Sequence, residues 1–364
     1  MDFFEIFKQA EYEFTYGTED DPEHHNALQV GLVAWFYLDK GYTQENRARI
    51  AEAYQLYHNE YGEKLKWGYI DEPNKDLDYS SISPKEFKRT IINSFGDDFY
   101  FHWYSDKGFR YASNYYVSAG SPVGWYESIH RPVSYFCFYL PVSEIRGVAR
   151  MEKITSLFCE ILQPIHGLMW LGMQQCQERE RYQHLEYEIG SSFLGVDIPC
   201  SYISKCLRAG MRSVNWYTLF NNEWMENLGG MSYLCGALND PAIKINPYKG
   251  SVIIQAGEYP ELGWVNDNPY PELYVKVNKV LKLIRAPKIG SLGYGSIAGE
   301  IRFDKNSTAK WLSRFDVDLP SLATVPAAKD PVRITCWTDD IAPHAGQWAA
   351  IVDGATGYIQ TREG

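Results

Sequence analysis

Features that mark a membrane-bound or exported protein are missing from this sequence of 364 residues. No apolar run approaches the roughly 20 residues that a membrane-spanning helix needs, and the densest run, Pro132–Val142, is typical of a strand. The N-terminal stretch MDFFEIFKQAEYEF opens with an acid and has no basic region ahead of an apolar core, as a secretory signal has. We therefore expect a cytoplasmic protein with no membrane partner.

Metal and redox motifs are missing as well. The seven cysteines are scattered and form no CxxC pair, the spacing that zinc sites and thiol redox centres use. There is no HExxH pattern, and His24 and His25 are adjacent, so their side chains diverge in a helix or a strand. The sequence predicts no metal and no other cofactor.

No motif of a catalytic nucleophile or a phosphate-binding loop is present. The nearest candidate, Gly293–Gly299 (GYGSIAG), has neither the spacing of GxSxG nor a GK[ST] element. Glu258 and Glu261 are three residues apart and could serve as the acid and base of a hydrolase acting on a polar substrate. Such pairs usually come from different strands, so we favour a protein without enzymatic activity and keep the hydrolase as an alternative.

Positive charge is scarce relative to negative charge. The chain has 35 Lys and Arg against 46 Asp and Glu, a formal net charge of −11. Direct binding of nucleic acid is disfavoured, because phosphate contacts need Lys and Arg. Aromatic residues are abundant, with 28 Tyr and 11 Trp, and protein interfaces favour both residue types. Acidic and aromatic surface together suit a partner of a basic protein.

Hydrophobic periodicity predicts an α+β fold, a mixed or antiparallel sheet packed with helices. We expect strands at 27–38, 109–118, 132–140, 166–174 and 214–220, with a hairpin at 244–256. We expect helices at 44–61, 143–162, 271–284 and 307–314, a short helix capped by Asn221 or Asn222, and a charged helix or loop at 178–188. Residues 71–98 are predicted to form an excursion over the surface. The hairpin signals argue against a wholly parallel sheet.

Composition divides the chain into three parts. Residues 1–318 are predicted to form the α+β domain, and 319–330, rich in Pro, Ala and Ser, to form a linker. Residues 331–364 contain patterns of three short strands and predict a small SH3-like β-module. At under 40 residues this module cannot hold much core of its own.

The stretch Ser251–Asp267 (SVIIQAGEYPELGWVND) joins an apolar strand to an acidic, aromatic turn that is bracketed by glycines and stiffened by Pro260. Further acidic pairs lie within the excursion. From these features we predict that the partner contacts Glu258, Tyr259, Glu261, Trp264, Asp267, Asp71, Glu72, Asp97 and Asp98.

Four segments carry a resemblance to a known family: PIHGLMWLG (164–172), VNWYTLFNNEWMENLGG (214–230), SVIIQAGEYPELGWVN (251–266) and WLSRFD (311–316). In that order they resemble the type VI secretion immunity protein family (TsiV/TsiT-like), over about residues 27–316. One departure is Gly263-Trp264-Val265-Asn266, where relatives more often have an acid after the glycine.

The resemblance implies a non-enzymatic antidote that binds a toxin delivered by the type VI apparatus. Some members resemble partners of nuclease toxins that cut DNA in the cytosol. The leading hypothesis is therefore an immunity protein that neutralises a basic, nuclease-like effector by direct binding. The alternatives are the Glu258/Glu261 hydrolase and an adaptor that loads the effector into the secretion system. The sequence predicts no particular oligomeric state.

Overall fold

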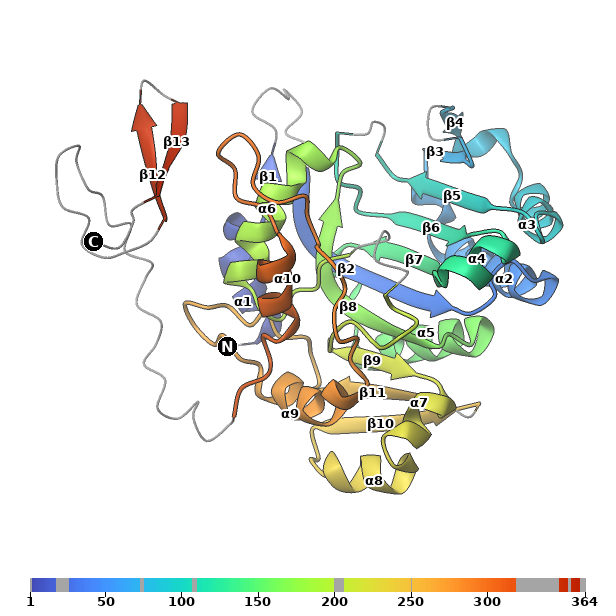
Figure 1. The fold of residues 1–364 in the computed structure, drawn as a ribbon. Coiled ribbons are helices and arrows are strands. Elements are labelled where there is room, and N and C mark those ends of the chain that lie inside the picture. The colour runs from blue at the N-terminus through green and yellow to red at the C-terminus, as the bar shows by residue number, and fades with distance from the viewer. Residues whose placement is uncertain are drawn as a thin grey trace.

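A single large antiparallel sheet organises the computed structural model of the chain (Figure 1). The structure describes residues 2–17, 26–72, 75–106, 110–199, 206–249 and 251–318, and the backbone of 347–352 and 355–360. The strand order is β10-β11-β9-β8-β2-β7-β6-β5-β3-β4, with β1 paired to β2. The strands are β1 (Tyr16–Gly17), β2 (Asn26–Leu38), β3 (Trp67–Ile70), β4 (Leu77–Asp78), β5 (Phe99–Tyr104), β6 (Tyr116–Ser121), β7 (Ser134–Leu140), β8 (His166–Gln175), β9 (Tyr217–Phe220), β10 (Ile243–Tyr248) and β11 (Ser251–Ala256).

Helices pack on the faces and ends of this sheet (Figure 1). They are α1 (Phe3–Ala10), α2 (Gln44–Tyr61), α3 (Pro84–Asn93), α4 (Gly124–His130), α5 (Val148–Leu162), α6 (Arg179–Ser192), α7 (Asn222–Asn227), α8 (Gly230–Ala237), α9 (Glu272–Leu281) and α10 (Lys305–Leu312). Short 3₁₀ turns occur at Glu11–Glu13, Gly62–Lys64, Tyr79–Ser81, Val142–Glu144 and Lys282–Ile284.

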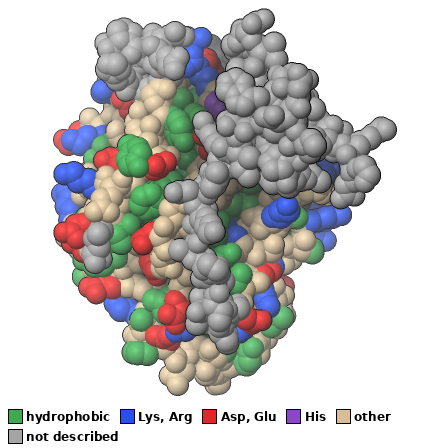
Figure 2. All heavy atoms as spheres, turned by 90° about the vertical axis from the view of Figure 1, so that its left-hand side faces the viewer, with side chains coloured by type: hydrophobic (Ala, Val, Ile, Leu, Met, Phe, Trp, Pro, Cys, Tyr) green, Lys and Arg blue, Asp and Glu red, His purple; other side chains and the backbone are tan. Residues whose placement is uncertain are grey.

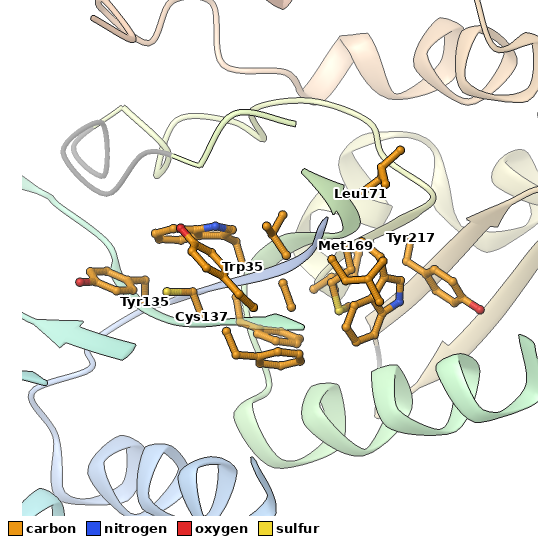
Figure 3. Packing of buried hydrophobic residues seen from close by; sticks show 14 of the residues in the cluster. Trp35, Tyr135, Cys137, Met169, Leu171 and Tyr217 are labelled. Carbon is orange, nitrogen blue, oxygen red and sulfur yellow. The ribbon is translucent and has the colours of Figure 1, made fainter. Parts of the chain in front are cut away.

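Aromatic rings pack on both faces of the central strands. On the side of α2 and α5, Phe138 of β7 lies 4.6 Å from Phe158 and 5.5 Å from Tyr57, measured between ring centroids. On the other side, Trp35 of β2 lies 5.3 Å from Tyr135 of β7, as Figure 3 shows. The alternation of side chains along each strand produces this arrangement. The hydrophobic core therefore extends through both faces of the sheet.

The predicted fold class is confirmed: the structure is α+β, with an antiparallel sheet packed with helices. The predicted helix 44–61 has the bounds of α2, and the predicted strand 27–38 is β2 but for one residue. The hairpin 244–256 is β10 and β11. Asn221 caps α7 as expected, because its side chain accepts a hydrogen bond from the Trp224 N–H.

Other predicted elements were wrong or absent. The strand expected at 109–118 begins at Tyr116, and the helix expected from 143 begins at Val148. Helices α1 and α8 were not predicted. Strand β5 was not predicted either, because it directly follows Asp97 and Asp98 in the sequence, and acidic residues indicate a loop. The excursion 71–98 is only partly superficial, because α3 within it buries Phe87 and Ile91 completely.

The C-terminal tail is described for one antiparallel hairpin, β12 (Gln347–Val352) with β13 (Ala355–Gln360). The predicted linker 319–330 and the first predicted strand of the tail lie outside the described residues. The division at 318 and 331, and the SH3-like module, stay predictions.

Candidate partner-binding surfaces

The turn after β11 carries five of the predicted partner contacts, and its first half is fixed by hydrogen bonds to Gly257. The Gly257 carbonyl accepts from Trp216 Nε1 at 3.0 Å and from Gln255 Nε2 at 2.9 Å. Gly257 has φ of +94°, a conformation that favours glycine. The chain therefore leaves the buried strand in one defined direction.

The second half of the turn is held against residues 192–195. The Leu194 N–H donates to the Gly263 carbonyl at 2.9 Å, and the Gly195 N–H donates to the Leu262 carbonyl at 2.8 Å. A Cβ on Gly263, whose φ is +60°, would lie 2.6 Å from the Gly195 nitrogen. The Trp264 ring stacks on Phe193 at 5.8 Å. Backbone pairing and close approach thus make the turn rigid.

A pocket of about 250 Å³ opens between this turn and helix α1. We call it the turn pocket, and it is lined by Phe3, Ile6, Tyr259, Pro260, Glu261, Leu262, Gly263, Trp264, Asp267 and Asn268. The Tyr259 ring holds α1 in place, stacking on Phe3 at 6.4 Å and meeting the edge of Phe4 at 5.8 Å. Four of the predicted partner contacts therefore share one pocket.

Burial within the turn pocket raises the pKa of Glu261, and the like charge of Glu272 raises that pKa further. Glu258 is exposed and lies outside the lining of the pocket. The turn pocket thus does not bring the two glutamates of the hydrolase hypothesis together.

The remaining predicted contacts, Asp71, Glu72, Asp97 and Asp98, lie together although they come from separate segments. We call them the acidic corner. Beneath them the fully buried Arg47 donates from Nη2 to the Asp97 carbonyl at 2.7 Å, with its guanidinium 5.2 Å from the centre of the Phe99 ring. Pairing of β3 with β5 brings the two segments side by side.

Carboxylates of the acidic corner bind backbone groups. Asp71 Oδ1 accepts from the Tyr100 N–H at 2.8 Å, and Asp98 Oδ1 accepts from the Val123 N–H at 2.5 Å. Burial lowers the pKa of Arg47 to about 10, although the negative charges of the acidic corner act to raise that pKa. Burial also raises the pKa of Asp71, outweighing the Tyr100 N–H and the Arg47 charge. The carboxylates of Asp71 and Asp98 therefore stabilise the fold through backbone hydrogen bonds.

The turn pocket and the acidic corner lie at opposite ends of the sheet. Strands β11 and β3 are separated by six strands, and every pairing between them is antiparallel, so the two strands run in opposite directions. The turn pocket follows the end of β11 and Asp71 follows the end of β3. In Figure 1, α1 marks the first end and α4 the second.

Figure 2 views the molecule from the α1 end, where acidic, basic and hydrophobic side chains intermingle. The described part of this face has no single sign of charge. A charged partner would therefore be recognised on this face by individual groups such as Glu261 and Asp267, and not by the overall charge of the face.

Sequence reasoning missed two sets of residues beside these surfaces. Trp125 and Ile129, four residues apart on α4, are 63% and 68% exposed. Helix α4 begins directly after Val123, whose N–H donates to Asp98 Oδ1. Exposed apolar side chains of this size are typical of interfaces. Phe3 and Ile6 were missed because α1 was missed, although Asp2 and Glu5 form a capping box that could have indicated it.

Within the described ranges, no three His, Cys, Asp or Glu side chains are grouped so that they could hold a metal ion. Among the described residues, none of the helices combines the length and the apolar character that crossing a membrane requires.

This architecture is similar to that of a known protein, and the sequence matches a known family. The chain resembles the T6SS protein PA0821 of Pseudomonas aeruginosa, with a TM-score of 0.78 and 24% sequence identity, over 88% of this chain and 92% of that chain. At this identity the likeness shows a shared fold. No curated protein matches the chain. The model of the TsiV family, described as type VI immunity for VRR-NUC, matches residues 49–315. The resemblance seen in the sequence is confirmed, and the chain belongs to the TsiV family of type VI immunity proteins.

Proposed function

We propose that this protein is a cytoplasmic immunity protein that binds and neutralises a cognate nuclease effector of the VRR-NUC type, without catalysis of its own. The observation that carries the proposal is the family match over residues 49–315, which extends from α2 to the end of α10. The match includes the turn pocket apart from its α1 wall, and it includes the acidic corner.

Charge supports this assignment. A nuclease presents Lys and Arg to the phosphates of its substrate, whereas this chain has a net charge of −11. Complementary charge speeds encounter and disfavours wrong partners. The main proposed contacts are the turn-side residues Glu258, Tyr259, Glu261, Trp264 and Asp267. The acidic corner is proposed as a secondary contact, because the carboxylates of Asp71 and Asp98 already accept hydrogen bonds from backbone N–H groups.

Distance limits how these contacts work together. A strand rises about 3.3 Å per residue, so the ten residues of β8 span roughly 33 Å. A typical stable interface buries about 800 Å² of each partner. An interface of that size centred on one end of the sheet leaves the other end largely uncovered. We therefore treat the two surfaces as separable in experiments.

Inhibition of the purified effector tests the proposal. The VRR-NUC effector of the same genome is titrated with this protein and its DNA cleavage is measured. We expect cleavage to stop at a stoichiometric ratio and the two proteins to co-purify. Continued cleavage at excess immunity protein, or failure to co-purify, contradicts the proposal.

A charge-reversal experiment then locates the contact. The double variant Glu258→Lys/Glu261→Lys should weaken binding and flatten its salt dependence. The matched control is Glu223→Lys/Glu226→Lys, since these two exposed glutamates are also three residues apart, on α7. Both variants change the net charge equally, so a loss confined to the turn identifies a local contact. Equal losses indicate general electrostatic steering instead.

The two other hypotheses gain no support. Glu258 lies outside the turn pocket that holds Glu261, so no observation favours the hydrolase. An effector-loading adaptor differs from an immunity protein in its deletion phenotype. Loss of an adaptor stops secretion, whereas loss of an immunity protein harms the producing cell.

A further inference from the structure

The turn pocket has an unusual electrostatic lining. Two carboxylates, Glu261 and Asp267, line it, and none of the described residues in its lining is Lys, Arg or His. Three other pockets of the described part include cations: Arg179 in one, Lys40, Arg131 and Arg208 in the second, Lys310 and Arg314 in the third. The turn pocket therefore attracts positive charge. Each of the other three contains at least one cation, which offsets the acids of the first two, while the third has no acid in its lining.

Aromatic rings form the walls of the same pocket. Tyr259, Trp264 and Phe3 line it, and a cation over an aromatic face is attracted by the ring quadrupole, most strongly for Trp. Its volume of about 250 Å³ lies below the roughly 300–1,000 Å³ of pockets for drug-sized ligands. This size suits one long side chain.

We propose that the turn pocket receives an arginine or lysine side chain of the effector, with its charged head between Glu261 and Asp267 and its stem against Tyr259 and Trp264. This inference rests on the proposed function and adds to it a specific recognition site. A nuclease carries such side chains at the surface that contacts phosphate. Occupying one of them would remove it from DNA.

The surroundings of Glu261 favour such a contact. Its Oε2 lies 3.5 Å from Asn268 Nδ2, at the outer limit of a hydrogen bond, so the carboxylate retains capacity to accept from a ligand. The Glu261 N–H is already bound, donating to the Tyr274 hydroxyl at 3.2 Å, which fixes the position of the residue. Charge interactions in a partly buried site are stronger than in bulk water. A rigid site also loses little entropy when it binds.

Small cations test the pocket without the effector. Ethylguanidinium is titrated into the ¹⁵N-labelled protein and the indole N–H signal of Trp264 is followed, with neutral ethylurea as the matched ligand. We expect a saturable millimolar shift with ethylguanidinium, at least fivefold weaker in Glu261→Gln/Asp267→Asn. The control Glu258→Gln changes an acid on the same turn but outside the pocket and should bind like the wild type. Equal shifts with ethylurea, or undiminished binding in the double variant, would overturn the proposal.

The effector provides the second measurement. By calorimetry, Glu261→Gln/Asp267→Asn should bind the effector at least tenfold more weakly than wild type. The matched control Glu223→Gln/Glu226→Gln, at exposed positions of α7 outside the proposed contacts, should bind within twofold of wild type. If the wild type does not bind, the proposed function fails. If the wild type binds and the double variant binds equally well, the pocket proposal fails while the function stands. Should the double variant not fold, Asp267→Asn alone, at an exposed position, replaces it, with a threefold loss expected and an unchanged affinity contradicting the proposal.

Discussion

The acidic corner and the turn pocket are both formed by acidic loops. Carboxylates of the corner bind groups within the fold, whereas those of the turn pocket face the pocket. In the corner, Asp71 and Asp98 accept hydrogen bonds from backbone N–H groups and lie over the buried Arg47. In the turn, backbone groups are satisfied by Trp216 and Tyr274, and the carboxylates line a pocket instead. An acidic loop is therefore available to a partner only where other groups complete its backbone hydrogen bonds.

This difference separates stability from binding. Changes in the acidic corner should lower the free energy of unfolding and leave effector affinity nearly unchanged. Changes to the carboxylates of the turn pocket should do the reverse.

The largest effect is expected for Arg47→Ala. Arg47 is fully buried, its stem packs in the core, and the Asp97 carbonyl would lose its donor. Loss of packing and of that hydrogen bond should lower the free energy of unfolding by about 3 kcal/mol, measured by urea denaturation. Arg47→Met keeps the apolar bulk and should lose less than half as much. A tenfold loss of effector affinity with little loss of stability would show that the corner is the binding surface.

Gly263→Ala should cause the second-largest loss of stability, and it should distort the turn pocket by displacing the backbone of the turn from Gly195. The new Cβ would meet the Gly195 nitrogen at 2.6 Å, in addition to the cost of φ at +60°. We expect a loss of about 2 kcal/mol in unfolding free energy and weaker ethylguanidinium binding. Gly290→Ala is the matched control, because Gly290 also has positive φ, +85°, but open space around its Cβ. Equal losses for both variants would mean that the close approach to Gly195 contributes nothing.

Asp71→Ala should cost about 1 kcal/mol, since the Tyr100 N–H loses its acceptor and alanine is strained at φ of +55°. Asp71→Asn retains an acceptor and tolerates this conformation, and it should change stability little. Urea midpoints of the two variants measure the difference. If asparagine is as damaging as alanine, the charge of Asp71 rather than its hydrogen bond stabilises the corner.

Local patterns allowed much of the fold to be predicted. The apolar run of β2 and the helical spacing of α2 are properties of one segment each. β5 was missed because its alternation, with Phe101 facing the helices and His102 the other side of the sheet, lies beside acidic residues that indicate a loop. Tertiary pairing, rather than local composition, decided that segment.

The site was predictable to the same extent. Tyr259, Glu261, Trp264 and Asp267 lie within one turn, so the sequence places them near one another. That all four line one pocket became evident only from the structure. The wall that α1 contributes is far away in the chain and could not be paired with them. The inward direction of Asp71 depends on its hydrogen bond to the Tyr100 N–H of strand β5, and no local sequence pattern indicates that contact. Whether the nine predicted residues contact the effector stays a prediction.

The smallest expected effect concerns the pH dependence of stability at Glu261. Burial and the charge of Glu272 raise its pKa above the usual 4.5, so the folded state binds this proton more tightly than the unfolded state does. The ionised carboxylate therefore destabilises the fold as pH rises above about 4.5, while below that value no penalty exists. Glu261→Gln should match the wild type at pH 4 and exceed it at pH 7.5 by a few tenths of a kcal/mol, seen as a higher urea midpoint. A Glu261→Gln variant less stable than wild type at pH 7.5 would mean that Glu261, like Asp71, is committed to the fold, and the distinction between the two surfaces would disappear.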